Sequence, residues 1–409
     1  MAEALGHRNL HTALKRVRQN QGSPGIDGMT VGELPDWLRA NWPRVREKLL
    51  AGTYQPQPVK RQEIPKSGGG VRELGIPTVL DRFIQQALLQ VLQPRIDPSF
   101  SEHSYGFRPG RRAHDAVVAA QRYIQEGRCW VVDLDLEKFF DRVHHDVLME
   151  RLGRRIADKT VLRLIRRYLE AGVMVHGVKV ERHEGTPQGG PLSPLLANVL
   201  LDEVDQELER RGHAFVRYAD DCNVYVRSRR AAERVMAWLV RAYGRLRLRI
   251  NLAKSAVAPA TDRSLLGFAF WVGPKGRIRR GVARKALKTM KQRVRHLTGR
   301  TRGRSLAQVA EDLRGYLPGW KSYFRLAETP GVFLRLDQWL RRRLRTLQLV
   351  HWKRGPTIYR ELRARGFSAR TAARAAANAR HRWNTSALAI HVVLPNSLFD
   401  ELGVPRLAA

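Results

Sequence analysis

Two short apolar segments that carry acidic residues constrain the fold of this chain more than any other feature. Residues 129–136, CWVVDLDL, alternate between two faces as a β-strand does, and they place Asp135 near the end of that strand. Residues 215–226, FVRYADDCNVYV, predict a β-hairpin with Asp220 and Asp221 at or near its turn. A strand and a hairpin can lie side by side in an antiparallel sheet. The pattern therefore predicts a sheet that brings the three aspartates together.

Three carboxylates packed this closely need a source of positive charge. Two unit charges 4 Å apart repel by about 4 kcal/mol at an effective dielectric constant near 20. Divalent cations relieve the repulsion, and carboxylate oxygens suit Mg²⁺. Two such ions about 3.5–4 Å apart form the clamp used for nucleotidyl transfer, which requires no protein nucleophile. An Asp pair in a turn, taken alone, fits a plain polar turn equally well. Together with the strand at Asp135, it predicts a site for two Mg²⁺ ions, with Mn²⁺ as a substitute.

The net charge of +36 indicates a polyanionic partner. Basic residues are interleaved with Trp and Leu, as in LDQWLRRRLRTLQLVHWKRG, and such surfaces suit nucleic acid better than a membrane. An arginine-rich composition from a GC-rich genome is the alternative, although acidic residues would then usually keep pace. The chain has no apolar run of the roughly 18 residues that span a bilayer and no secretory leader. We therefore expect a cytoplasmic protein that is nucleoid-associated when it acts on DNA.

Other residue types that bind metals give no convincing site. The two cysteines, Cys129 and Cys222, form no CxxC pair, which excludes a cysteine-based zinc site and a disulfide scaffold. We expect both to be small buried residues in strands. The adjacent His144 and His145 would diverge on a helix, so we do not expect them to bind a metal together.

The remaining patterns predict an α+β fold. Residues 61–77 predict a β-hairpin around a glycine turn. A helical pattern starts at Asp81 and is expected to end at Pro94, and a second helix is expected from about Glu137, directly after the strand. After Gly276, basic helices are expected to dominate to about residue 365.

The ordered motifs resemble those of reverse transcriptases. VVDLDLEKFFD, GTPQGGPLSPLLANVLLDEVD, FVRYADDCNVYV and SLLGFAFW stand in the order of the motifs of that family. QNQGSPGIDGMT, RELGIPTVLDRFIQQAL and SYGFRPGRRAHDAV are typical of its group II intron branch, and LRGYLPGWKSYFRLA, LDQWLRRRLR and LPNSLFDELGVPRL resemble the thumb and maturase-specific region. The resemblance covers nearly the whole chain. Many relatives carry a Cys/His endonuclease after the thumb, and the lack of one here resembles the endonuclease-lacking, group IIC-like lineage.

The resemblance implies a right-hand polymerase with fingers, an antiparallel-sheet palm, a helical thumb and a small C-terminal unit. We expect an N-terminal extension and fingers at 1–130, a palm with finger insertions at 131–280, a basic helical thumb at 281–365 and a C-terminal DNA-binding or maturase unit at 366–409. The implied activity is RNA-directed DNA polymerisation beside a maturase role in intron splicing and retrohoming. The implied partners are an RNA template, in particular group II intron RNA, a DNA primer or target, and deoxynucleoside triphosphates. The sequence does not indicate an oligomeric state.

The resemblance also assigns site residues. It matches Asp135, Asp220 and Asp221 to the catalytic, metal-binding aspartates. Six further residues match nucleotide-binding positions: Lys66, Arg72 and Arg82 at the triphosphate, Phe140 beneath the sugar, Gln188 beside the ribose, and Lys254 in the region after the hairpin. A bulky ring at position 140 would leave no space for a ribose 2′-hydroxyl, and this favours deoxynucleotides over ribonucleotides.

Each nucleotide-binding assignment has a plainer alternative. Phe140 fits a core aromatic residue, and Gln188 fits a glutamine in a solvated loop. Arg82 would serve equally well as an ion-pair partner of Asp81. Lys66, Arg72 and Lys254 fit solvent-exposed basic residues.

Three biological roles are compatible with these motifs. The first is a reverse transcriptase that mobilises its intron, and the second is a splicing maturase with a vestigial polymerase site. The presence of all three aspartates argues against such decay. The third is an intron-independent reverse transcriptase in phage defence or DNA repair. The sequence does not separate the first role from the third.

Overall fold

The computed structural model describes residues 1–65, 70–175, 178–180, 184–186, 189–300, 303–379, 383 and 394–408. It divides into two compact units, Met1–Arg263 and Ser264–Ala409. The finer division into fingers, palm, thumb and C-terminal unit stays a prediction.

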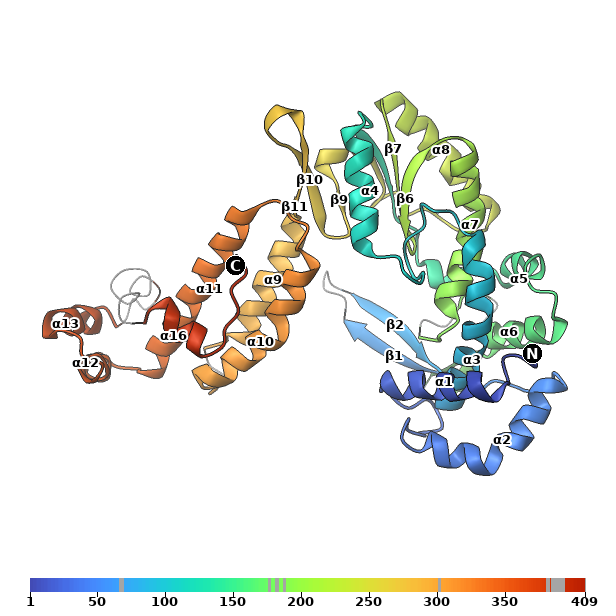
Figure 1. The fold of residues 1–409 in the computed structure, drawn as a ribbon, viewed down its shortest axis with the longest axis horizontal. Coiled ribbons are helices and arrows are strands. Elements are labelled where there is room, and N and C mark those ends of the chain that lie inside the picture. Colours follow the sequence, from blue (N-terminus) through green and yellow to red (C-terminus); the bar gives the residue numbers. More distant parts are fainter. Residues whose placement is uncertain are drawn as a thin grey trace. The chain divides into compact units, whose positions relative to one another are not determined.

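The central sheet of the first unit positions the acidic residues. It has four strands in the order β6-β7-β3-β8, of which β6 and β7 are labelled in Figure 1. Their bounds are β3 Trp130–Leu134, β6 Ala214–Tyr218, β7 Asp221–Val226 and β8 Ala256–Pro259. β3 pairs antiparallel with β7 in a register that ends with Leu134 opposite Cys222. Asp135 directly follows Leu134 and Asp221 directly precedes Cys222, so both lie at the same end of the sheet, and the predicted sheet of strand and hairpin is confirmed.

Helices cover both faces of this sheet. α8 (Arg229–Arg245) packs against β3, β7 and β8, whereas α4 (Ala113–Gln125) packs against β6 and β7. Val131 and Val132, whose side chains point to opposite faces of β3, are both buried. Asp221, at the start of β7, is exposed. The acidic end of the sheet is therefore the part that solvent and substrate can reach.

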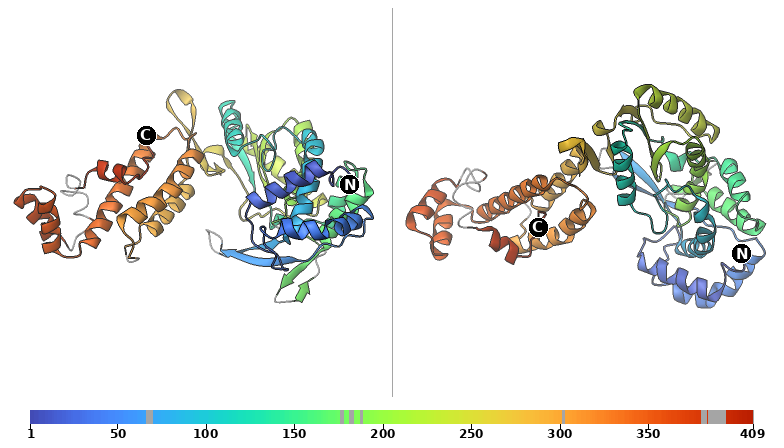
Figure 2. Two further views of the ribbon diagram at one scale, coloured as in Figure 1. Left: turned by 60° about the horizontal axis from the view of Figure 1, so that its bottom comes forward. Right: turned by 45° about the horizontal axis from the view of Figure 1, so that its top comes forward.

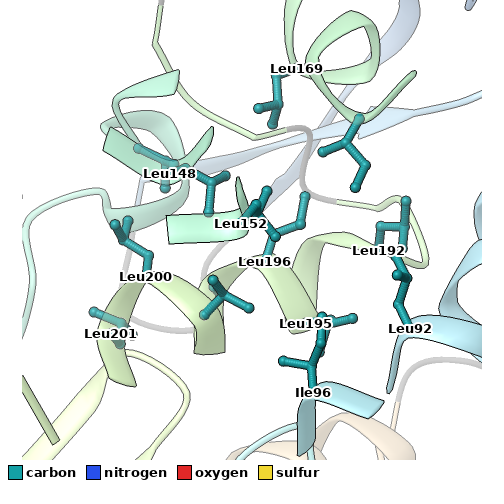
Figure 3. Packing of buried hydrophobic residues seen from close by; sticks show 14 of the residues in the cluster. Leu92, Ile96, Leu148, Leu152, Leu169, Leu192, Leu195, Leu196, Leu200 and Leu201 are labelled. Carbon is teal, nitrogen blue, oxygen red and sulfur yellow. The ribbon is translucent and has the colours of Figure 1, made fainter. Parts of the chain in front are cut away.

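A leucine-rich core lies among four helices of the first unit, α3 (Val79–Ile96), α5 (His145–Gly153), α6 (Lys159–Glu170) and α7 (Ser193–Arg210). Figure 3 labels the side chains that meet there: Leu92, Ile96, Leu148, Leu152, Leu169, Leu192, Leu195, Leu196, Leu200 and Leu201. The apolar residues of α7 recur at helical spacing, so one broad face of this helix is buried. α7 is thereby fixed against the core close to the central sheet, because it also packs against β6.

A second sheet of the first unit has the order β2-β1-β4-β5. Its strands are β1 Val59–Pro65, β2 Val71–Ile76, β4 Val173–Val175 and β5 Val178–Val180. β1 and β2 form the predicted antiparallel hairpin, and β1 also pairs parallel with β4. The N-terminal helices α1 (His7–Gln19) and α2 (Leu34–Leu50) precede this sheet, and α1 packs against α3.

The predicted end of α3 at Pro94 is wrong. The helix begins at Val79, capped by Thr78, and runs through Pro94 to Ile96. Proline removes one backbone donor from the helix. Ile96 is buried in the core, and this burial favours continuing the helix for two more residues.

The α-helix predicted from about Glu137 is also wrong. The backbone N–H of Glu137 donates to the carbonyl of Arg249 at 2.8 Å, and Lys138 adopts a left-handed conformation with φ 48°. Both features interrupt a helical hydrogen-bond ladder. A short 3-10 turn, Phe139–Asp141, follows instead, and α5 begins only at His145.

The second unit combines a small sheet with helices. Its antiparallel strands have the order β11-β10-β9, with bounds β9 Ser264–Leu265, β10 Phe268–Val272 and β11 Ile278–Val282. Its helices are α9 Arg284–Leu297, α10 Leu306–Tyr323, α11 Pro330–His351, α12 Gly355–Ala364, α13 Ala369–Ala377 and α16 Asn396–Glu401. α10 packs against α9 and α11 (Figure 2). The predicted basic helices are thus confirmed from Arg284 onward, whereas the sequence analysis missed β11.

The segment 394–408 folds back onto α11. Arg341 donates to the carbonyl of Val404 at 3.1 Å, and Arg345 donates to the carbonyl of Leu394 at 2.8 Å. Both arginines are buried. These two basic residues of α11 therefore hold the protein's own chain.

The two cysteines differ from each other. Cys222 is buried in β7 as predicted, but Cys129 is exposed and precedes β3. Burial of Cys129 was wrongly predicted because the strand begins one residue later. Among the described residues, no helix is both long and apolar enough to cross a membrane.

Candidate active site

A tight hairpin turn carries two of the three aspartates. β6 ends at Tyr218 and β7 begins at Asp221, which leaves Ala219 and Asp220 as the turn. Ala219 has φ 58°, a left-handed conformation that few non-glycine residues adopt. Turns of this size with positive φ match the twist of the flanking strands. The hairpin therefore presents Asp220 and Asp221 at the end of the sheet.

The backbone of Asp135 is held by the segment before β8. Its N–H donates to the hydroxyl of Ser255 at 3.0 Å, and its carbonyl accepts from the N–H of Asn251 at 2.9 Å. With both backbone groups bonded, the side chain has a defined direction. Its carboxylate lies 3.6 Å from the ammonium of Lys254.

The neighbouring aspartates act electrostatically on Asp221. Partial desolvation, followed by the negative charges of Asp220, Asp135 and Asp133, raises the pKa of Asp221 to about 7. The ammonium of Lys254 acts in the opposite direction. Negative charge is therefore gathered around Asp221, and Lys254 offsets part of its effect.

The donor chemistry of this cluster suits Mg²⁺, because all three side chains are hard oxygen ligands. Within the part of the chain that the structure describes, no group of three or more His, Cys, Asp or Glu side chains is gathered as a metal site. The aspartates are thus close enough to affect the pKa of Asp221 without forming a closed ligand set. Their role as metal ligands stays a prediction.

Asp133 lies on β3, two residues before Asp135, and its side chain bonds to neighbouring residues. Its carboxylate accepts from Asn223 at 3.1 Å and from the guanidinium of Arg263 at 2.7 Å. Arg263 also donates to the carbonyl of Lys254 at 3.0 Å. Asp133 is thereby linked to the segment that carries the lysine beside Asp135.

A cavity of about 530 Å³ in the first unit collects two of the predicted nucleotide-binding residues. Phe140 and Arg82 both line it, together with Gly189, Gly190 and Gln86. Phe140 is partly buried and packs edge-on against Phe139, with ring centroids 5.0 Å apart. It therefore forms part of a cavity wall, as a residue beneath a sugar would.

Arg82 does not pair with Asp81, so that alternative is wrong. Asp81 is buried and accepts from Tyr54 and Thr78, each at 2.8 Å. The guanidinium of Arg82 donates instead to the carbonyl of Ser23 at 2.7 Å, and its buried Nε has no hydrogen-bond partner among the residues that the structure describes. Burial is also the main cause that lowers the pKa of Arg82. A partly desolvated cation at a cavity wall is suited to an anionic ligand.

Of the four remaining predicted nucleotide-binding residues, only Lys254 has a described side chain. Lys66 and Gln188 lie outside the described residues. The backbone of Arg72 pairs with Ile64 in the β1–β2 hairpin, but its side chain is not described. Lys254 is beside Asp135 rather than in the cavity lining.

Two glycines bring the loop at the cavity close to its neighbours. A β-carbon at Gly189 would lie 2.7 Å from the carbonyl oxygen of Gly75, and φ there is 144°. A β-carbon at Gly190 would lie 2.5 Å from the side-chain oxygen of Gln85. The close approach of this loop to the backbone of β2 therefore requires glycine at position 189, whereas at position 190 the side chain of Gln85 could move aside.

The second unit holds a cluster of cations around one aromatic ring, which we term the Trp339 cluster. It consists of Trp339 and four basic residues, Lys291, Arg295, Arg300 and Arg343. Three of the cations lie over the indole, at 5.8 Å for Lys291, 5.9 Å for Arg295 and 5.5 Å for Arg343. Desolvation, with repulsion from Arg300 and Arg295, lowers the pKa of Arg343 to about 10.

The Trp339 cluster lacks acidic partners. Elsewhere in the second unit, Arg304 pairs with Asp312 and Arg280 with Glu328. Within the described ranges, no ion pair with a carboxylate is found for any basic residue of the Trp339 cluster. A basic surface was predicted from the sequence but no single residue of it, because Lys291 and Arg295 come from α9 whereas Trp339 and Arg343 come from α11.

Arg217, a fully buried residue beside the hairpin turn, was not predicted from the sequence. It pairs with Asp205 of α7, which is likewise fully buried. One signal was present: Asp205 shares helical spacing with the buried Leu201 and Leu208. An acid on the apolar face of a helix indicates a buried cation nearby.

Comparisons with known proteins agree with the motifs. Residues 64–270 match the family described as "Reverse transcriptase (RNA-dependent DNA polymerase)", and residues 287–366 match "Group II intron, maturase-specific domain". The chain is similar to Protein YkfC of Escherichia coli (strain K12), with 34% identity over 288 residues, which cover 61% of this chain and 74% of that protein.

Two intron proteins match shorter stretches. Group II intron-encoded protein LtrA of Lactococcus lactis subsp. cremoris is 39% identical over 164 residues, which cover 40% of this chain and 27% of LtrA. The Putative COX1/OXI3 intron 2 protein of Saccharomyces cerevisiae is 30% identical over 200 residues, which cover 48% of this chain and 22% of that protein. The matched region is thus less than a third of either intron protein.

Proposed function

This chain belongs to the reverse transcriptase family and carries a group II intron maturase-specific domain, and from this premise we propose that it copies RNA into DNA at Asp135, Asp220 and Asp221. The observation that carries the proposal is the shared end of β3 and β7. Asp135 follows the end of β3 and Asp221 begins the paired strand β7, and partial desolvation with neighbouring carboxylates raises the pKa of Asp221 to about 7.

The three aspartates would hold the metal ions. Bound Mg²⁺ supplies the positive charge that stabilises both the attacking primer 3′-hydroxyl and the leaving pyrophosphate. Lys254, beside Asp135, offsets carboxylate charge, and Arg82 offers guanidinium donors to phosphate oxygens at the cavity wall.

Phe140 supports the choice of deoxynucleotides. It lines the same cavity as Arg82, so a nucleotide whose phosphates meet the guanidinium would place its sugar near the ring. The ring leaves no room for a 2′-hydroxyl, and ribonucleotides are thereby disfavoured.

We further propose that the second unit binds RNA, in particular group II intron RNA, and so supports splicing and retrohoming. The match of residues 287–366 to the maturase-specific domain supports this role. The Trp339 cluster offers unneutralised cations and an aromatic face, which suit the phosphates and bases of RNA.

Primer extension tests the proposed activity. A DNA primer annealed to an RNA template, with deoxynucleotides and Mg²⁺, should be extended by the wild type. Asp220→Ala should lower the rate by more than roughly 100-fold. It removes a proposed metal ligand itself, and losing even a residue that only hydrogen-bonds to a ligand typically costs about 10- to 100-fold. Asp36→Ala is the matched control, since Asp36 is 78% exposed in a surface ion pair and its loss should change little. No extension by the wild type would reject the enzymatic proposal, and full extension by Asp220→Ala would reject the metal assignment.

A further inference from the structure

Arg217 uses all three guanidinium nitrogens in a fully buried site. Its side chain and that of Asp205 are both 0% exposed. Nε donates to Asp205 at 2.7 Å, and one terminal nitrogen donates to Ser104 at 2.7 Å and lies 2.6 Å from the carboxylate of Asp205. The other terminal nitrogen donates to Asn198 and to the carbonyl of Ala219, each at 2.9 Å. Each nitrogen of the guanidinium therefore has a partner within the chain.

One of these bonds reaches the hairpin turn that carries the aspartates. The carbonyl of Ala219 belongs to the peptide group that joins Ala219 to Asp220. Because a peptide group is planar, a hydrogen bond to this oxygen restrains the orientation of the whole group. Ala219 has φ 58°, a conformation that persists only where the surroundings enforce it. Gly106 adds a second restraint, because a β-carbon there would lie 2.1 Å from the backbone nitrogen of Ala219. Asn198 holds the carbonyl of Gly106 at 3.0 Å.

We propose that the Arg217–Asp205 pair is a positioning device for the active site. Asp205 fixes and neutralises the guanidinium, and the guanidinium fixes the Ala219 carbonyl and thereby the carboxylates of Asp220 and Asp221. Neither member of the pair touches substrate. This inference rests on the proposed polymerase function and deepens it, because it assigns the geometry of the metal ligands to residues behind them.

A purely structural role would make a different prediction. If the pair only stabilised the fold, activity would follow the fraction of folded protein. If the pair positions the turn, a folded variant without the bond to Ala219 should have a lower kcat and a higher Mg²⁺ half-saturation. The KM for deoxynucleotides should stay close to that of the wild type, because the cavity lined by Arg82 and Phe140 is unchanged.

Arg217→Lys is the first variant. Lysine keeps a positive charge beside Asp205, but its single ammonium lacks the planar fork that reaches Asp205 and Ala219 together. We expect kcat to fall about 10- to 100-fold, with a several-fold higher Mg²⁺ half-saturation. Melting curves recorded on the same samples separate loss of positioning from loss of folding.

The double variant Arg217→Met with Asp205→Leu is the second test. It removes both charges, and apolar replacements of a buried ion pair often preserve or increase stability. It also leaves the Ala219 carbonyl without its donor. We expect a folded protein with the same loss of kcat and the same change in Mg²⁺ dependence.

Arg108→Lys is the matched control. Arg108 is also buried, pairs with Asp97 at 3.0 Å and holds the carbonyl of Ser104 at 3.1 Å, but it does not contact the hairpin. It should lose stability while the folded protein keeps a wild-type kcat and Mg²⁺ half-saturation.

The outcomes distinguish failure of the positioning role from failure of the proposed polymerase function. Wild-type kcat and Mg²⁺ dependence in either folded Arg217 variant would overturn the positioning role, as would equal losses in Arg108→Lys. A wild type that does not extend primers would instead reject the polymerase function itself.

Discussion

Arginine serves opposite purposes in two regions of this molecule. Beside the hairpin, the Arg217 guanidinium is neutralised by Asp205, and each of its three nitrogens donates a hydrogen bond within the chain. In the Trp339 cluster, Arg343 meets further cations and an indole, and its pKa is lowered to about 10 by desolvation and by neighbouring arginines. A neutralised arginine adds rigidity to a site, whereas unneutralised cations keep their charge for an external anion.

Because the two regions differ in charge neutralisation, we expect changes beside the hairpin to affect catalysis and changes in the Trp339 cluster to affect binding. Changes beside the hairpin should act on stability and on kcat, with little effect on nucleic-acid affinity. Changes in the Trp339 cluster should act on affinity and its salt dependence, with no loss of folding.

Breaking the buried pair should give the largest effect on stability. Asp205→Asn leaves the Arg217 cation buried without its counter-charge, and we expect a loss of about 3–5 kcal/mol in the free energy of unfolding. Urea denaturation followed by circular dichroism measures this. Asp36→Asn, in an exposed ion pair with Arg39, should cost at most about 1 kcal/mol. Similar losses in both variants would contradict the contrast between neutralised and solvent-screened charge.

Neutralising the Trp339 cluster should weaken nucleic-acid binding. The triple change Lys291→Gln, Arg295→Gln and Arg343→Gln should lower affinity for an RNA–DNA duplex by roughly 10- to 100-fold at low salt. It should also reduce the slope of log K against log salt by about 2 to 3, since each lost phosphate contact removes about 0.9. Fluorescence anisotropy across a salt series measures both quantities.

The control for this triple change is Arg304→Gln, because Arg304 already pairs with Asp312. It should change the slope by less than one contact. The melting temperature of the triple variant should not fall, because mutual repulsion among the cations is removed. An unchanged slope would show that the Trp339 cluster does not meet phosphate.

Discrimination between deoxynucleotides and ribonucleotides should depend neither on Arg217 nor on the arginines of the Trp339 cluster. Phe140→Ala should lower the preference for deoxynucleotides over ribonucleotides by about 10- to 200-fold, the range expected when one steric contact is lost in a pocket. Competing single-nucleotide incorporation measures the ratio. Phe139→Leu, at the buried neighbour, should leave the ratio unchanged, and equal discrimination before and after Phe140→Ala would remove its assigned role.

The positions of the three aspartates could be predicted from the sequence, but the buried Arg217–Asp205 pair beside them could not. Strand alternation and the hairpin signal were enough to predict that Asp135 lies at the same end of the sheet as Asp220 and Asp221, because both are local patterns. The partner of Arg217 was not evident, because Asp205 lies on a different element and only tertiary packing brings them together. An arginine in a strand is also more often solvent-exposed than buried.

Errors in the predicted elements have a similar cause. The helix expected after Asp135 is interrupted by a bond from Glu137 to Arg249, a contact between residues far apart in the chain. The Trp339 cluster likewise combines residues of α9 and α11. Local propensity does not carry this information.

The central claim is that Asp135, Asp220 and Asp221 form a metal site whose charges repel one another when no metal is bound. The folded-state pKa of Asp221, about 7, lies above the value near 4 of an unfolded chain. The folded form thus binds the proton more tightly, and stability without metal should fall as the pH rises from about 4 to about 7. Asp221→Asn should remove this slope.

Melting temperatures at pH 8, with and without Mg²⁺, test this claim most directly. Without metal, Asp221→Asn should melt at a higher temperature than the wild type, because one repelling charge is gone. Saturating Mg²⁺ should raise the melting temperature of the wild type by binding the folded form and should leave that of Asp221→Asn nearly unchanged. No shift in the wild type, or an equal shift in both proteins, would contradict the metal site.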